Sequence, residues 1–254
     1  MRLRTWSIAL SLVVGLSIVG VASSETKVGS NVDVRTTVSL KVANAEAQKL
    51  LPSGWQVSPV SSGPNEGANL SLTFIDQLLN QDAEGKPAGS ARTLAFVVPA
   101  KNAATGPAAI NVVRILTANP AGIPGPYKVG APAAFRFEQS IKATDVEPAT
   151  VSERWEVRAQ SGGTVTLALD YLRALPTRAK TEVKIYGGPD PAFFRIYRVD
   201  GGNDVLRSGP ASIDRVKKVA LRVTIPDLKK AFDGSEQIVS VVAQPWYVRE
   251  VSLP

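Results

Sequence analysis

The most constraining feature of this sequence is a two-residue alternation of apolar and other side chains that recurs in short runs. The clearest run places Val165, Leu167, Leu169 and Tyr171 on one face of a strand. Such alternation is typical of a β-strand with one buried face. About ten to twelve runs at roughly even spacing predict a mainly β protein (a β-rich α+β fold), built as an antiparallel barrel-like or double-sheet structure.

Two short helices are expected between the strands. Asn44 can cap the first, which continues to Leu51 before a Pro-Ser-Gly stop. Pro226 suits the first turn of the second helix, and Gly234 closes it. Both helices are too short to form a layer of their own, so the sheet must supply the core.

The N-terminus has the three parts of a secretory signal peptide. Arg2 and Arg4 are followed by sixteen uncharged residues at 6–21 and by small residues at 22–24. An uncleaved anchor is the alternative, but sixteen residues reach only about 24 Å of a ~30 Å hydrocarbon core. The sequence therefore predicts a signal peptide at 1–23 and a periplasmic or secreted protein that contacts the membrane only through this segment.

The mature chain shows no internal repeat and no shift in composition that would mark a boundary. Residues 24–254 are therefore expected to form a single domain. Its polar first stretch, residues 23–32, is expected to be a flexible lead-in. Nothing in the sequence indicates an oligomeric state.

Two missing residue types exclude several classes of site. The chain has no cysteine and no histidine, so it has no Ser-His-Asp triad, no thiolate nucleophile and no zinc site with the usual ligands. Its net charge of +7 is dispersed along the chain, which argues against a nucleic-acid surface. Phosphate-binding glycine motifs are absent, and nothing points to a metal or cofactor.

Three kinds of site remain compatible with this inventory. They are a lysine that forms a Schiff base, a pair of carboxylates, and a binding cavity without chemistry. The acidic residues Glu153 and Glu156 face opposite ways at strand spacing, so solvated surface positions are expected for them rather than a catalytic pair.

Lys128 is the candidate nucleophile. It lies beside Tyr127 in a Pro/Gly-rich loop, residues 118–132, and has no acidic residue within nine positions on either side. Burial in an apolar pocket activates a lysine amine for Schiff-base formation. A solvent-exposed loop lysine, with Tyr127 as an aromatic anchor of the loop, is the alternative.

Three segments resemble the acetoacetate decarboxylase-like superfamily. In residues 38–55 (VSLKVANAEAQKLLPSGW) a strand precedes a short helix and a Leu-Leu-Pro stop, residues 70–76 read LSLTFID, and residues 125–130 read GPYKVG. The resemblance implies a mostly antiparallel, barrel-like structure around a central cavity. It also implies an active-site loop in the last of these segments.

The match to the decarboxylases is incomplete at the catalytic loop. These enzymes carry two adjacent lysines, of which the first forms the Schiff base. Anchored on Gly130, the resemblance puts Tyr127 at the first lysine and Lys128 at the second, and a shift of one residue makes Lys128 the nucleophile without its helper. Arg114 or Arg136 is then a candidate to supply the missing cation or to hold a carboxylate ligand.

These observations leave three hypotheses about function. The first is an exported module that binds a small apolar or carboxylate- or carbonyl-bearing molecule, with Tyr127, Arg114 and Arg136 as ligand-binding candidates. The second is a decarboxylase-type lyase that acts through Lys128. The third is a non-enzymatic structural or interaction protein of the envelope, which requires a filled barrel. No cofactor is expected in any of them.

Overall fold

A computed structural model of the chain describes residues 25–104, 106, 108–120 and 127–254. The predicted signal peptide at 1–23 and part of the Pro/Gly loop lie outside these residues. The described strands are β1 (Thr26–Lys41), β2 (Trp55–Val57), β3 (Leu70–Gln81), β4 (Ala91–Asn102), β5 (Ala108–Thr117), β6 (Gly130–Lys142), β7 (Thr150–Ala159), β8 (Thr164–Leu172), β9 (Thr177–Gly187), β10 (Phe194–Ser208), β11 (Ile213–Asp214), β12 (Val216–Val223) and β13 (Gln237–Leu253). They confirm the mainly β prediction.

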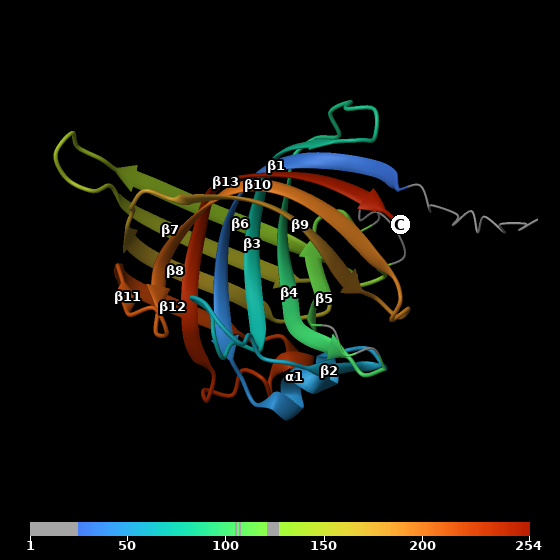
Figure 1. The fold of residues 1–254 in the computed structure, drawn as a ribbon. Coiled ribbons are helices and arrows are strands. Elements are labelled where there is room, and N and C mark those ends of the chain that lie inside the picture. The colour runs from blue at the N-terminus through green and yellow to red at the C-terminus, as the bar shows by residue number, and fades with distance from the viewer. Residues whose placement is uncertain (1–24, 105, 107, 121–126) are drawn as a thin grey trace, which may run out of the picture.

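Seven of these strands close into a ring (Figure 1). Their order is β5-β9-β10-β13-β1-β3-β4, and β4 pairs back onto β5. Most neighbours are antiparallel, as expected, but β5 runs parallel to both β9 and β6. Closure leaves only the ends of the ring open, so the inner faces of seven strands surround one space.

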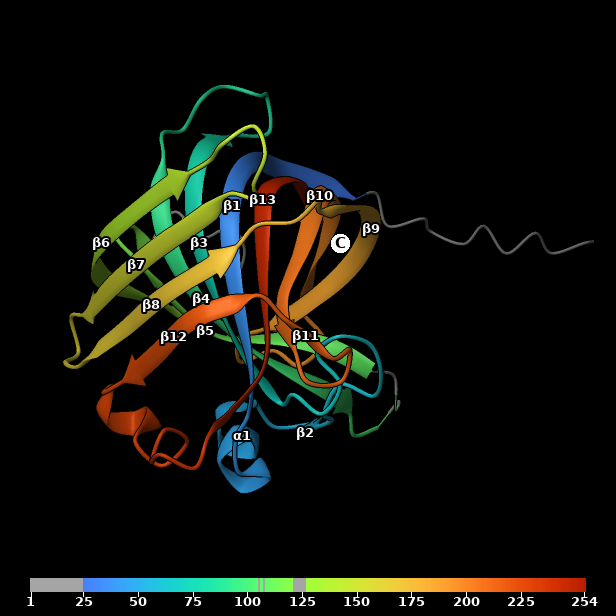
Figure 2. The same cartoon turned by 90° about the vertical axis from the view of Figure 1, so that its left-hand side faces the viewer.

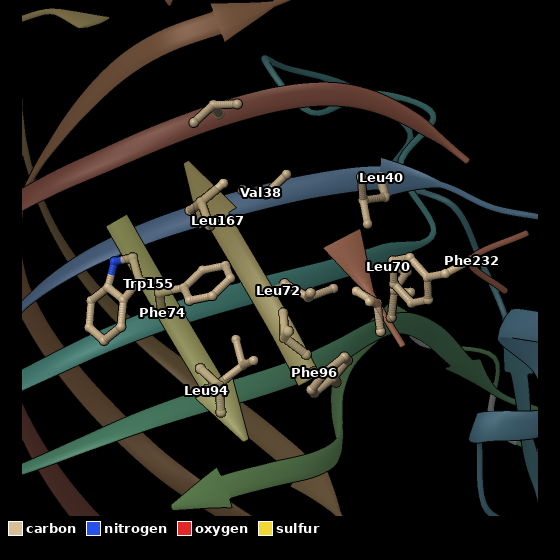
Figure 3. Packing of buried hydrophobic residues seen from close by; sticks show 14 of the residues in the cluster. Val38, Leu40, Leu70, Leu72, Phe74, Leu94, Phe96, Trp155, Leu167 and Phe232 are labelled. Carbon is tan, nitrogen blue, oxygen red and sulfur yellow. The ribbon is translucent and has the colours of Figure 1, made fainter. Parts of the chain in front are cut away.

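The remaining large strands form a second layer outside the ring. Strands β6, β7, β8 and β12 are neighbours in that order, and they cross in front of β1, β3 and β4 in Figure 2. The main core fills the space between the two layers. In Figure 3, Phe74 of the ring lies against Trp155 of the second layer, with ring centres 5.6 Å apart. Each such buried side chain contributes about 1.5–3 kcal/mol.

On β1, β3 and β4, the ring strands that face the second layer, the apolar side chains of the alternation point out of the ring. On β1, Val38 and Leu40 enter the core while Thr37 and Ser39 line the space inside the ring. The same holds along β3 and β4. The side chains that alternate with the core residues consequently face a cavity, not bulk solvent.

The lead-in predicted at residues 23–32 is instead the first part of β1, which begins at Thr26. Thr26 pairs with Leu253, and Ser30 pairs with both Glu250 and Gln81. These backbone pairings hold the segment although its side chains are polar. An apolar pattern cannot reveal a strand that is held in this way.

Both expected helices are present in shortened form. Helix α1 (Asn44–Leu50) begins after Ala43, and the Asn44 side chain does not cap it but accepts a hydrogen bond of 2.7 Å from Asn69. The second helix is a single 3-10 turn, η2 (Pro226–Leu228).

In the part of the chain that the structure describes, no helix is long and apolar enough to cross a bilayer. The same residues contain no cluster of side chains suited to hold a metal ion.

Candidate functional site

The ring encloses a cavity of about 840 Å³. All seven ring strands contribute to its wall. Many of the side chains that line it are small, among them Thr37, Ser39, Thr73, Ala95, Val112 and Thr181. Small side chains at these inward positions leave the space open. A cavity of this volume is within the range of small-molecule sites.

Three arginines project into this cavity from neighbouring strands. They are Arg35 of β1, Arg195 of β10 and Arg249 of β13, and these strands lie side by side in the ring. Each occupies an inward position in the alternation of its strand. The cavity therefore carries a concentrated positive charge that the dispersed charge of the sequence did not suggest.

Arg35 has an internal partner. Its Nε and Nη2 donate to the two carboxylate oxygens of Asp33, at 2.5 and 2.9 Å, and Asp33 is fully buried. Although burial disfavours the charged form, the hydrogen bond and charge of Asp33 raise the pKa of Arg35. The guanidinium also lies 3.4 Å from the centre of the Tyr247 ring. This arginine is neutralised and held in place.

Arg195 has no carboxylate partner among the described residues, although only 4% of it is exposed. Its Nη1 lies 3.5 Å from the Tyr197 hydroxyl, while Nε and Nη2 have no hydrogen-bond partner. Its guanidinium lies 3.7 Å from the centre of the Tyr127 ring. A buried guanidinium without an anion costs several kcal/mol of desolvation.

Arg249 is the third cation. Its Nε donates to Asn31 at 2.7 Å, and Asn31 in turn donates to Asp33. Its guanidinium lies 4.4 Å from the centre of the Tyr197 ring. No carboxylate of the described residues pairs with it directly, so two of the three arginines lack an anion.

Two buried tyrosines, Tyr127 and Tyr197, form a cluster with the three arginines and Asp33. The pKa values of the two tyrosines shift in opposite directions in this environment. Burial alone would raise the pKa of Tyr197, but Arg249, Arg195 and Arg35 together bring it below the ordinary value. Burial raises the pKa of Tyr127, whose hydroxyl donates to the backbone oxygen of Ile185. Tyr127 is thus a neutral support beneath Arg195.

Comparisons with known proteins identify the fold. No family model and no curated protein matches the chain. Among solved structures, it is similar to an acetoacetate decarboxylase-like enzyme from Sphingomonas wittichii RW1, with a TM-score of 0.52, 14% identity, and coverage of 90% of this chain and 91% of that one. The chain has the acetoacetate decarboxylase-like fold. This confirms the distant resemblance at the level of structure.

Two further structures share this fold. Acetoacetate decarboxylase from Legionella pneumophila subsp. pneumophila str. Philadelphia 1 superposes with a TM-score of 0.52 at 12% identity, covering 97% of this chain and 96% of that one. The enduracididine biosynthesis enzyme MppR, complexed with pyruvate, gives a TM-score of 0.50 at 10% identity, with the same coverage of 97% and 96%.

In this acetoacetate decarboxylase-like fold, none of the four residues singled out from the sequence lines the cavity. Lys128 is exposed, has a positive φ of 50° and does not line the cavity. Arg136 is exposed and donates to Glu138 at 2.6 and 2.9 Å. Arg114 pairs with Asp227.

Only Tyr127 belongs to the cluster. It is fully buried and does not line the cavity itself. No lysine is among the described residues that line the cavity.

The cluster residues that the sequence analysis missed lie far apart along the chain. A signal was present in 192–199, where Arg195 and Tyr197 occupy one face of a strand. A second was the run Asn31, Asp33 and Arg35, in which three polar residues alternate along β1. A polar strand face ordinarily meets solvent, whereas in the acetoacetate decarboxylase-like fold this face is the cavity wall.

Proposed function

We propose that this protein is an exported binding protein with an acetoacetate decarboxylase-like fold, and that its cavity holds a small carboxylate-bearing molecule without forming a Schiff base. The single observation that carries this proposal is that no carboxylate of the described residues pairs with Arg195 or Arg249. A bound carboxylate supplies the missing anion and accepts hydrogen bonds from guanidinium groups.

The described residues offer no free carboxylate for this role. Asp33 is buried and engaged with Arg35, and Asp82 of the cavity wall accepts a hydrogen bond from the backbone of Lys86. The sequence outside the described residues contains no Asp or Glu. A carboxylate for these arginines must therefore come from solution.

A 2-oxo acid is the natural first probe. MppR, which shares the fold, is known in complex with pyruvate. Pyruvate combines a carboxylate with a carbonyl oxygen, and both groups can accept hydrogen bonds from arginine. The apolar wall residues near the cluster, such as Val183 and Val251, suit its methyl group.

The binding is proposed to be non-covalent because a Schiff base needs an amine within reach. The described wall of the cavity contains no lysine, and Lys128 is exposed. The cavity also argues against the purely structural alternative, which requires a filled barrel.

Export is proposed from the sequence of residues 1–23. Cleavage there would leave β1 whole, because it begins at Thr26. Intact-mass analysis of protein recovered from a periplasmic extract tests this part. A mass that retains the first 22 residues would contradict cleavage.

Isothermal titration calorimetry with pyruvate tests the binding proposal. Pyruvate should bind, whereas its neutral methyl ester should bind at least about tenfold more weakly, because a hydrogen bond to a charged group contributes about 1.5–3 kcal/mol. Arg195→Gln should show the same loss. Arg136→Gln is the matched control, since Arg136 is exposed and away from the cavity. Equal affinities for the acid and its ester would refute the proposal.

A further inference from the structure

The charge balance of the cavity indicates a role for Tyr197. This inference rests on the proposed function. We propose that Tyr197 is ionised in the ligand-free cavity, where its phenolate is the counter-ion of Arg195 and Arg249. When a carboxylate enters, it replaces the phenolate in that role, and the phenolate oxygen takes up one proton from the solvent. Ligand binding and proton uptake are then a single coupled exchange.

The position of Tyr197 supports this role. Tyr197 is only 8% exposed and lines the cavity. Its hydroxyl lies 3.5 Å from Nη1 of Arg195, and the guanidinium of Arg249 lies 4.4 Å from the centre of its ring. No carboxylate of the described residues contacts Arg195, and the phenol oxygen of Tyr197 accepts its one hydrogen bond, so this oxygen is placed to become its anion.

The strands around Tyr197 contribute mostly positive charge. Strand β13 supplies Arg249 and Tyr247, and β1 supplies Arg35 with its partner Asp33. On β10 itself the neighbour is Arg195. The β9 residue paired with Tyr197 is Val183, which carries no charge.

Tyr127 completes the surroundings of Tyr197. Its ring lies against Arg195 and it also interacts directly with Tyr197, but its own pKa is raised mainly by burial, so it stays neutral. Asp33 therefore offsets only one of three arginines. An ionised Tyr197 offsets a second.

The exchange conserves charge. Before binding, the phenolate carries one negative charge beside two unpaired arginines. After binding, the carboxylate carries that charge and the phenol is neutral. The buried charge of the cluster is unchanged by the ligand, which avoids the cost of placing an additional anion or leaving an additional cation in a low-dielectric space.

The ligand-free protein gives the first test. The chain has five tyrosines, and near-ultraviolet absorbance reports their ionisation. One tyrosine should ionise at a pH clearly below the ordinary value of about 10. Tyr197→Phe should remove this transition. Tyr171→Phe is the matched control, because Tyr171 is buried in the main core and burial raises its pKa.

The second test adds pyruvate to the wild-type protein. Saturating pyruvate should move the early transition upward by about one pH unit or more, as a neighbouring anion does. Above the transition, the dissociation constant should rise about tenfold per pH unit. Calorimetry in buffers of different ionisation enthalpy should report uptake of about one proton per bound pyruvate at those pH values.

Each failure has a distinct meaning. An early transition that is absent, or that survives in Tyr197→Phe, overturns the assignment to Tyr197. Pyruvate binding with no proton uptake overturns the exchange and leaves the proposed function intact. No pyruvate binding at all overturns the proposed function and the exchange together.

Discussion

The guanidinium of Arg195 lies 3.7 Å from the ring centre of Tyr127, and no carboxylate of the described residues meets it. The aromatic ring offers a cation–π contact in place of an anion. Tyr127 is itself fixed by its hydrogen bond to the backbone oxygen of Ile185 and by edge-on packing against Phe193, with ring centres 5.4 Å apart. Tyr127, the loop residue predicted to bind ligand, therefore supports Arg195, the residue that we propose to bind it.

Two substitutions of Tyr127 should separate the contribution of its hydroxyl from that of its ring. Tyr127→Phe removes only the hydroxyl and leaves the Ile185 oxygen unpaired, so the free energy of unfolding should fall by about 1–3 kcal/mol. Tyr127→Ala also removes the ring beneath Arg195 and should cost about 3–5 kcal/mol. Urea denaturation measures both. If the two variants lose equal stability, the ring does not support Arg195.

The Asp33–Arg35 pair should be the most sensitive part of the cluster. Asp33→Asn leaves Arg35 buried without a counter-ion, and such a change costs about 3–5 kcal/mol. Saturating pyruvate should recover part of this loss because it supplies an anion to the same cluster. Urea denaturation with and without pyruvate measures the recovery. Asp82→Asn, in the connection between β3 and β4, should change stability much less.

The strand pattern was readable in the sequence because a buried face repeats every second residue. Runs such as Val165 to Tyr171 became β8, and the apolar residues of β3 and β4 entered the core as expected. The parallel pairings of β5 were not readable, because strand direction depends on which distant strands meet. The first part of β1 was missed because backbone pairing and polar side-chain contacts, rather than a repeating apolar face, hold it.

The candidate site was less predictable than the fold. Arg35, Arg195 and Arg249 come from three strands, and only closure of the ring brings them together. Lys128 was conspicuous in sequence because its loop has no acidic residues, yet it is exposed. Local composition describes a residue's neighbours along the chain, whereas the wall of a cavity is made by residues that are distant in the sequence.

Glu153 corrects the expectation of a solvated surface and gives a pH-dependent prediction. It is 2% exposed and accepts hydrogen bonds from Trp155 at 2.6 Å and Gln139 at 3.3 Å. Burial raises its pKa above the ordinary value, despite the opposing hydrogen bonds. Its contribution to stability is therefore fully present below the unfolded pKa of about 4.3 and is lost as pH rises through the folded pKa.

Removing this titration should stabilise the protein at neutral pH. Glu153→Gln keeps an oxygen acceptor for Trp155 but never ionises, so its stability should exceed that of the wild type near pH 7 and approach it near pH 4. Thermal denaturation of both proteins between pH 4 and pH 7 checks whether their stabilities converge at the lower pH. Glu84→Gln, at an exposed turn, should leave the profile unchanged. A parallel offset at every pH would contradict the assignment to Glu153.

Gly202 should tolerate no side chain. A Cβ atom there would lie 2.4 Å from two ring atoms of Trp246 on the neighbouring strand β13. Gly202→Ala should therefore displace the indole and cost about 1–3 kcal/mol, with a change in tryptophan fluorescence. Gly209→Ala, just after β10, is the matched control, since its Cβ would meet only the Val239 oxygen at 4.0 Å. Equal effects of the two substitutions would exclude the clash as the cause.

The exposed position of Lys128 leads to a prediction about chemistry. If ligands bind without a Schiff base, borohydride treatment with pyruvate should add no mass to the protein, and Lys128→Ala should leave pyruvate affinity within about twofold of the wild type. The physical reason is that an exposed amine is solvated and has no access to a carbonyl held by Arg195. Mass spectrometry after reduction, with peptide mapping, measures any adduct. A reduced adduct on Lys128 that disappears in Lys128→Ala would instead support the lyase hypothesis, and would require the loop before β6 to bring the amine into the cavity.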